Sequence, residues 1–389
     1  MLENRWFVLT SLFIARFALG FQFQSAGSVA TFLIRDFGVD YAQIGTLVGL
    51  YMLPGVVVAI PGGILGRRFG DKRIVLIGIV LMIIGGVLAG AAEKYSLVLT
   101  GRLLSGIGAC VLFVLMTKMV ADWFAGKELF LGMSIFIIGW PMGIAAAQAT
   151  QGSLAEMRSW NAVFHLTAVL LVLAFATMAA FYRRPPTISL AAAEEATSLS
   201  RRDVWLVCIA GAIWMFLNAA YLVMLSFGPT LLIERGASVA DAGFTVSLMS
   251  WVFIGALPLG AYLATRYQTP DFIMAGGLIV SILIGALIPV ATAVAVITFA
   301  LFGISFAMAT PMIASLPAQS LAPQNRGPGL GIYYVWYYAG LPVLTPVGGL
   351  LKDRLGTAAF SVFFATAMMA LCLGLLILLR YEQRRLTNA

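Results

Sequence analysis

The chain has 389 residues, of which 61% are hydrophobic and 10% are charged, with a formal net charge of +8 at pH 7. Soluble domains carry about 25% charged residues, so a mean hydropathy of +0.98 excludes an ordinary soluble protein. The three cysteines all lie in apolar segments, and their spacing matches neither a disulfide framework nor a metal site. The composition therefore predicts an integral membrane protein, and we expect no cofactor and no bound metal.

Apolar blocks about as long as a bilayer crossing, roughly 20 residues, follow one another along the chain. We place them at 6–33, 42–65, 73–92, 96–120, 129–151, 161–182, 204–232, 240–264, 272–292, 294–318, 328–351 and 357–379. The longest polar interruption runs from Arg183 to Asp203 and divides the blocks six and six. The predicted fold is all-α with twelve transmembrane helices: a six-helix bundle over 1–182, a cytoplasmic linker over 183–203 and a second six-helix bundle over 204–389.

Basic residues are distributed unequally between the two sets of loops. If the N-terminus is cytoplasmic, fifteen lysines and arginines lie in the inner loops and six in the outer loops. Cytoplasmic loops of membrane proteins carry such an excess, so we predict a multi-pass protein of the plasma (inner) membrane with both termini cytoplasmic. The basic charge then reflects topology and not a nucleic-acid partner. We expect a monomer whose partners are membrane lipid and a small-molecule anion.

The two sets of six blocks resemble each other. Trp6 and Trp205 lie 199 positions apart, as do the segments "TFLIRDFG" at Thr31 and "TLLIERGA" at Thr230. Six crossings return the chain to its starting side, so this spacing predicts a six-helix unit duplicated in parallel orientation. Transporters with such repeats bind their substrate between the halves, near the middle of the bilayer.

Away from the ends of the apolar blocks, the charged residues are all basic. The sixteen acidic residues fall in loops or at helix ends, whereas Arg16, Arg102 and Lys118 lie within blocks. Ionisable residues at membrane depth usually mark a pathway or site, and a cavity with arginine but no carboxylate favours an anion. Lys118 lies close enough to the inner end of its block to extend to the interface. Arg102 is equally consistent with a functional role and with a structural bond between helices.

Arg16 is the leading candidate for an anion site. It lies near the middle of the first block and shares one helical face with Gly20, Gln24 and Gly27. The alternative is a structural arginine bonded to helix carbonyls. In the second half, the run "YYVWYY" from Tyr333 presents rings on every face, so either Tyr334 with Tyr338 or Tyr333 with Tyr337 faces the cavity. Of these two pairs, we include Tyr334 and Tyr338 in the predicted site. The predicted substrate-binding residues are Arg16, Gln24, Asn218, Tyr221, Tyr334 and Tyr338.

Three motifs resemble those of the major facilitator superfamily. They are "GILGRRFGDKR" from Gly63, similar to the signature loop after the second helix, "RLLSGIG" from Arg102, similar to the fourth-helix motif, and "GWPMG" from Gly139, similar to a fifth-helix hinge. "GLPVLTPVGG" from Gly340 repeats the hinge. The resemblance implies gating or motif roles for Gly63, Arg67, Arg68, Gly70, Asp71, Arg73, Arg102, Gly106, Asp122, Gly139, Pro141 and Pro342.

Two details refine this resemblance. The family usually has Asp where this chain has Arg67, so the usual ion pair of that Asp is lost, and we predict that Arg68 pairs with Asp122 instead. The segments "YMLPG" and "WPMG" look most like the small-anion branch, which contains the cyanate and nitrate/nitrite porters.

We therefore predict a secondary active transporter that moves a small organic or inorganic anion by alternating access, through exchange or proton-linked symport. Two alternatives stay open: an efflux transporter of neutral or amphipathic compounds, and a non-transporting membrane scaffold or sensor. The chain has no Ser–His–Asp set, metal cluster or phosphate loop in its sequence, which argues against an enzyme.

Overall fold

The computed structural model describes residues 5–124, 129–183, 199–321 and 326–387, and within these ranges every regular element is a helix. The first half of the molecule contains α1 (Arg5–Ser28), α2 (Ala30–Phe37), α3 (Tyr41–Leu50), α4 (Gly55–Phe69), α5 (Asp71–Gly90), α6 (Tyr95–Trp123), α7 (Leu129–Met157) and α8 (Trp160–Phe181). The second half contains α9 (Arg201–Glu234), α10 (Val239–Trp251), α11 (Phe253–Arg266), α12 (Pro270–Leu287), the 3-10 turn η1 (Thr292–Val294), α13 (Ala295–Ala314), α14 (Leu316–Ser320), α15 (Arg326–Leu355) and α16 (Ala359–Thr387).

Each of the twelve predicted spans corresponds to one long helix or to two consecutive helices. In the described part of the chain, ten stretches are long and apolar enough to cross a membrane. The two remaining predicted spans correspond to α7 and α15, helices of 29 and 30 residues. The predicted all-α membrane fold is therefore confirmed. The predicted linker lies largely outside the described residues, and α9 already begins at Arg201.

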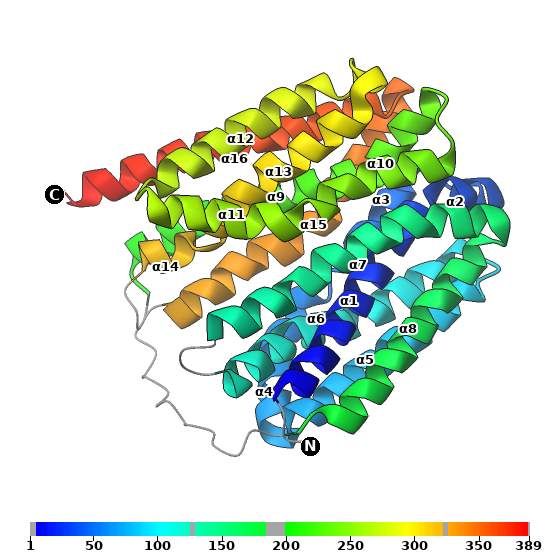
Figure 1. Ribbon diagram of the computed structural model, residues 1–389, viewed down its shortest axis with the longest axis horizontal. Coiled ribbons are helices and arrows are strands. Elements are labelled where there is room, and N and C mark those ends of the chain that lie inside the picture. Colours follow the sequence, from blue (N-terminus) through cyan, green and yellow to red (C-terminus); the bar gives the residue numbers. More distant parts are fainter. Residues whose placement is uncertain (1–4, 125–128, 184–198, 322–325, 388–389) are drawn as a thin grey trace.

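The helices pack in the same general way in the two halves. In the first half α1 lies against α7 and α8, and α5 lies against α6 and α8; in the second half α9 packs on α15 and α16, and α12 packs on α13 and α16. Figure 1 shows the halves side by side, with both termini toward one end of the molecule. We call this the terminal end, and we call the opposite end, where α2 lies, the α2 end.

The second span of each half is interrupted at an equivalent place. In the first half the chain turns at 51–54 between α3 and α4, and in the second half Val252 separates α10 from α11. A neighbouring helix packs tightly on each interruption: a Cβ on Gly106 would lie 2.3 Å from the Tyr51 carbonyl oxygen, and one on Gly303 would lie 2.6 Å from the Met249 carbonyl oxygen. Only glycine tolerates such an approach, and the matching contacts support the predicted duplication.

The two halves meet closely at the α2 end. A Cβ on Gly349 of α15 would lie 2.0 Å from the Tyr41 carbonyl oxygen of α3, and one on Gly45 would lie 2.6 Å from the Thr345 carbonyl oxygen. Asp353 also accepts hydrogen bonds from the first two backbone N–H groups of α3, at 3.1 and 2.9 Å. A carboxylate is favourable at a helix N-terminus, so Asp353 holds α15 of the second half onto α3 of the first.

Candidate functional site

Arg16 lies near the middle of α1, about 17 Å along the helix axis from Arg5 at ~1.5 Å per residue. Two glycines bring α7 against this part of α1. A Cβ on Gly139 would lie 3.2 Å from carbons of the Arg16 side chain, and one on Gly143 would lie 2.2 Å from the Phe17 carbonyl oxygen. Because larger residues would push the helices apart, these glycines place the Arg16 side chain between α1 and α7.

Three aromatic rings, which we call the aromatic cage, surround the Arg16 guanidinium. Its central carbon lies 4.1 Å from the ring centre of Phe113 on α6, and 5.1 and 5.6 Å from the ring centres of Phe136 and Trp140 on α7. Phe113 and Trp140 also pack edge to face, 4.8 Å apart. A cation over ring faces is attracted by their quadrupoles, more strongly where water is excluded. The cage therefore stabilises the positive charge without neutralising it.

Part of the hydrogen-bonding capacity of Arg16 is not used by the protein. Its Nε and Nη1 atoms are buried and have no hydrogen-bond partner. None of the ion pairs formed by the described residues includes Arg16. A buried donor without a partner costs about 1–3 kcal/mol, so the arrangement is unfavourable until an acceptor arrives. The planar N–H fork of arginine matches a carboxylate through two parallel bonds.

Tyrosines of α15 complete the surroundings of Arg16 from the second half. Tyr334, Tyr337 and Tyr338 all lie near the guanidinium, within range of its charge. Tyr333 instead packs within the second half, where its hydroxyl donates to the Ile313 carbonyl at 3.3 Å. The structure thus brings the predicted pair, Tyr334 and Tyr338, near Arg16 together with Tyr337, which the helical pattern had assigned to the other face.

The other second-half residues predicted for the site are engaged elsewhere. Asn218 donates to the Trp214 carbonyl of its own helix at 2.7 Å. The Tyr221 hydroxyl is hydrogen-bonded to Ser250 at 2.5 Å, and its ring stacks on Phe306. Both residues lie on α9, but neither side chain contacts Arg16 in the described structure. Their inclusion rested on polarity alone, which does not show which way a helix faces.

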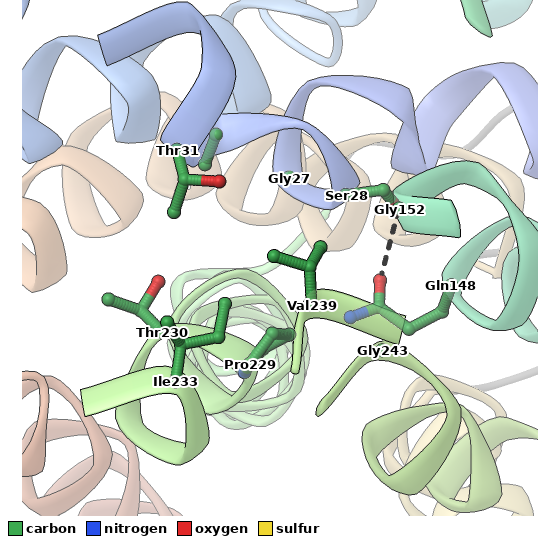
Figure 2. Close-up of a pocket in the computed structure, with 11 residues that line it drawn as sticks. Gly27, Ser28, Thr31, Gln148, Gly152, Pro229, Thr230, Ile233, Val239 and Gly243 are labelled. Carbon is green, nitrogen blue, oxygen red and sulfur yellow. Dashed lines mark hydrogen bonds between the residues drawn. The ribbon is translucent and has the colours of Figure 1, made fainter. Parts of the chain in front are cut away.

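Gln24 belongs to a polar cluster on the α2 side of Arg16, about 12 Å further along α1. Its amide donates to the Gln148 side-chain oxygen at 2.5 Å, and the Ser28 hydroxyl donates to the same oxygen at 3.3 Å. The Gln148 amide in turn donates to the Leu225 carbonyl of α9 at 3.2 Å. Figure 2 shows Gln148 beside Ser28, lining a small pocket between the halves. The structure thus commits Gln24 to Gln148, the residue that makes the hydrogen bond to the second half.

Arg102, for which the sequence left two interpretations, is fully hydrogen-bonded to neighbouring helices. The side chain is 1% exposed, and all three of its nitrogens are bound. Nε donates to the Leu47 carbonyl at 3.1 Å, Nη1 to the Gln22 carbonyl at 3.0 Å and Nη2 to the Phe23 carbonyl at 2.9 Å. The guanidinium also lies 4.4 Å from the Tyr51 ring centre. Arg102 therefore connects α6 to α1 and α3.

The signature loop at the terminal end is held by a different ion pair from the one predicted. Lys118 of α6 bonds Asp71 at 2.5 Å and lies 3.7 Å from Asp122. Arg68 is exposed and lies over the Phe69 ring. The predicted Arg68–Asp122 pair is therefore absent from the described part of the chain. Lys118 has taken the carboxylate because it lies one helical turn from Asp122 on the same helix.

The remaining residues of the predicted motifs lie within helices or at a turn between two helices. Gly63 and Arg67 lie on α4, Gly70 makes the turn into α5 at φ 92°, and Arg73 is exposed on α5. Pro141 and Pro342, predicted to be bending points, lie inside helices that run without interruption. The helix breaks lie in other spans: at 51–54 in span two, at Val252 in span eight, and nearer the span ends at Val29 in span one and Ser315 in span ten.

The chain matches the family model of the Major Facilitator Superfamily over residues 12–344 and 211–388. It therefore belongs to that superfamily. Membership confirms the prediction of a transporter and not an enzyme.

Several curated relatives carry transport assignments of their own. The 3-(3-hydroxy-phenyl)propionate transporter of Escherichia coli (strain K12) is 25% identical over 70% of this chain and 68% of that protein. The 4-hydroxybenzoate transporter PcaK of Pseudomonas aeruginosa is 21% identical over 64% and 63%. The gallate transporter of Pseudomonas putida is 22% identical over 41% and 35%.

Solved structures show the same fold. A bacterial homolog of the human lysosomal transporter Spinster, in an inward-facing and unoccupied conformation, superposes with a TM-score of 0.80 at 16% identity over 97% of both chains. The inward-open xylose transporter XylE of E. coli gives a TM-score of 0.79 at 13% identity over 95% of this chain and 94% of that one. These likenesses confirm the major facilitator fold.

Proposed function

We propose that this protein is a secondary active transporter of a small organic anion, an aromatic carboxylate, which Arg16 binds. The observation that carries the proposal is the state of Arg16: a guanidinium in the middle of the bundle, enclosed by aromatic rings, with two buried nitrogens that have no partner. A substrate carboxylate would satisfy these donors by charge-assisted hydrogen bonds.

The surroundings of Arg16 favour an acid that carries a ring. The aromatic cage on one side and the tyrosines of α15 on the other offer faces and edges for stacking. The three curated relatives are named for 3-(3-hydroxy-phenyl)propionate, 4-hydroxybenzoate and gallate, all aromatic acids. Cyanate and nitrate, which the sequence motifs had suggested, are too small to use this apolar surface. We therefore favour an aromatic carboxylate over a small inorganic anion.

Transport would proceed by alternating access between the halves. The contacts of Gly349 with Tyr41, and of Asp353 with the start of α3, close the α2 end. Gln148 also joins the halves, through its hydrogen bond to the Leu225 carbonyl. This bond lies at a depth between the closed α2 end and Arg16. If both termini are cytoplasmic, as the loop charges predict, the α2 end faces outward. These contacts would then have to break each time the site opens to the outside of the plasma membrane.

The driving force follows from the charges in the site. Inward movement of a monovalent anion opposes the membrane potential by ~2.3 kcal/mol per 100 mV. Among the described residues, no carboxylate forms an ion pair with Arg16, so none is placed there to carry a proton. We therefore favour anion exchange, or symport in which the proton accompanies the substrate.

Counterflow in proteoliposomes tests the proposal. Wild type, Arg16→Gln and Arg16→Lys would be compared with 4-hydroxybenzoate, its neutral amide, nitrate and cyanate. Uptake of the aromatic acid should fall by at least about 100-fold in Arg16→Gln, because two charge-assisted bonds are lost. Arg16→Lys should also be impaired, since lysine lacks the planar fork.

Arg35→Gln is the matched control, because Arg35 is 71% exposed on α2, where it pairs with Asp36. It should transport like wild type. Uptake of 4-hydroxybenzoate that does not depend on Arg16 would refute the anion site. Preference for the neutral amide would instead support efflux of neutral compounds, and no transport of any probe would favour a scaffold or sensor.

A further inference from the structure

The second half contributes a buried donor that has no partner inside the protein. The indole Nε1 of Trp214, on α9, is buried and makes no hydrogen bond. A buried tryptophan N–H usually finds an acceptor, and an unpaired one carries the same penalty as the nitrogens of Arg16. Its counterpart in the first half, 199 positions earlier, is Ala15, which adjoins Arg16. A residue with an unpaired donor therefore lies at nearly the same position in each half.

Packing places the Trp214 ring beside Tyr337, one of the tyrosines near Arg16. The ring stacks on Tyr333 at 5.8 Å between centroids, and lies 6.4 Å from the ring of Tyr337. The Tyr337 hydroxyl reaches the sulfur of Met52 in the first half at 3.9 Å, and the residue lies within range of the Arg16 charge. Tyr337 is therefore near both unpaired donors and marks the region that they share.

The two donors also lie at comparable depth. Arg16 and Tyr337 are each eleven residues from the terminal-end start of their helices, and Trp214 is thirteen residues from the start of α9. At ~1.5 Å per residue these positions are about 17–20 Å into the bundle. A ligand bound to Arg16 and Trp214 would therefore lie across the bundle, roughly perpendicular to the helix axes.

We propose that Trp214 is a specificity-determining residue: its indole N–H donates to an oxygen on the substrate ring, at the end away from the carboxylate. This inference rests on the function proposed above, because it assumes that Arg16 holds the carboxylate. The substrate class is then narrowed to aromatic acids with a ring hydroxyl or equivalent acceptor. Such a substrate bridges Arg16 of one half and Trp214 of the other, so its binding joins the halves directly.

The test compares acids that differ only in that hydroxyl. Binding of 3-(3-hydroxyphenyl)propionate and 3-phenylpropionate, and of 4-hydroxybenzoate and benzoate, would be measured by calorimetry on wild type and Trp214→Phe. Wild type should bind the hydroxylated member of at least one pair about tenfold more tightly, the size expected for one buried hydrogen bond. Trp214→Phe should remove this preference and bind the unsubstituted acid within about twofold of wild type.

Two further variants keep the result interpretable. Trp205→Phe makes the same exchange on the same helix at a side chain that is 52% exposed, and it should keep the wild-type preference. Should Trp214→Phe unfold, β-(3-benzothienyl)alanine at position 214 replaces the N–H with sulfur and retains the ring stacked on Tyr333. It should remove the preference just as phenylalanine does.

The outcomes separate this inference from the proposed function. Equal weakening of both members of a pair by Trp214→Phe would mean that Trp214 only packs, and would overturn the inference. So would a wild type that binds both members equally. In either case, binding that still depends on Arg16 leaves the proposed function standing. Binding of none of the four acids by wild type would overturn both.

Discussion

Two arginines lie inside the membrane-spanning helices of the first half, and they differ in every respect that matters for function. All three guanidinium nitrogens of Arg102 donate hydrogen bonds to backbone carbonyls of α1 and α3. Arg16 lies among three aromatic rings and leaves two buried nitrogens unpaired. Both carry the same charge at membrane depth. If Arg16 binds the substrate as proposed above, hydrogen-bond satisfaction is what separates a structural arginine from one that binds a ligand.

One of the three acceptors for Arg102, the Leu47 carbonyl, is available because the second span is broken. In a continuous helix the Tyr51 N–H would donate to the Leu47 carbonyl, four residues earlier. At the end of α3 it donates to the Gly49 carbonyl instead, which leaves the Leu47 carbonyl without its helical donor. Arg102 supplies the missing donor at 3.1 Å. An intramembrane carbonyl without a partner would be costly. Arg102 therefore stabilises the interruption that separates α3 from α4.

Replacing Arg102 with methionine should have the largest effect on the fold. The Leu47 carbonyl would be left without a donor, at about 1–3 kcal/mol, and the Gln22 and Phe23 carbonyls of α1 would each lose an additional bond worth about 1 kcal/mol; the sum is a large part of a typical folding free energy of about 5–15 kcal/mol. We expect Arg102→Met to aggregate, or to unfold at a much lower temperature, when monodispersity and thermal unfolding are measured in detergent.

The matched variant Arg16→Met should unfold at or above the wild-type temperature, because it removes a buried charge with unpaired donors and leaves an apolar side chain in the aromatic cage. Opposite behaviour would break the comparison: a well-folded Arg102→Met that has lost only transport would give Arg102 a functional role, and an unstable Arg16→Met would make Arg16 structural.

Removing one ring of the aromatic cage should have an intermediate effect. Phe113 lies nearest to the guanidinium, at 4.1 Å, and a cation–π contact in a dry site contributes about 0.5–2 kcal/mol. Phe113→Leu should weaken binding of 4-hydroxybenzoate by about threefold to tenfold, because the guanidinium is held less firmly, with little change in unfolding temperature. Unaltered affinity in a titration of the purified variant would show that the ring does not position Arg16.

The smallest effect is expected at Tyr51, whose ring lies under Arg102 as Phe113 lies under Arg16. Tyr51→Phe keeps that ring and removes only the hydroxyl, which donates to the Gln22 side-chain oxygen at 3.2 Å. A net change of about 1 kcal/mol or less is expected, seen as a shift of a few degrees in unfolding temperature, with transport retained. Loss of transport would show that the environment of Arg102 takes part in the transport cycle after all.

Much of the fold could be predicted from hydropathy, because each helix must satisfy its own backbone in lipid and so needs an unbroken apolar run of a definite length. The predicted span at 161–182, for example, corresponds to α8 at Trp160–Phe181. The breaks within spans two and eight were not predicted, since Pro54 and Trp251 do not by themselves require an interruption.

The candidate site was predictable only in part. Arg16 could be found because a charge in an apolar run is conspicuous. Phe113, Phe136 and Trp140 were missed because aromatic residues are frequent throughout the chain and nothing local marks those beside a charge. Gln24, Asn218 and Tyr221 were included for their polarity, yet their polar groups are bound elsewhere.

The sequence by itself determined the membrane-spanning class, the twelve spans, the superfamily resemblance and the presence of an intramembrane arginine. These properties depend on local composition and short motifs, which hydropathy and spacing express directly. The packing of the helices alone decided that Arg102 is satisfied, that donors of Arg16 and Trp214 are not, and that Lys118 pairs with Asp71 and lies beside Asp122, the carboxylate expected for Arg68. Hydrogen-bond partners come from helices far apart in the chain, so the choice between a structural and an available charge is made when those helices pack.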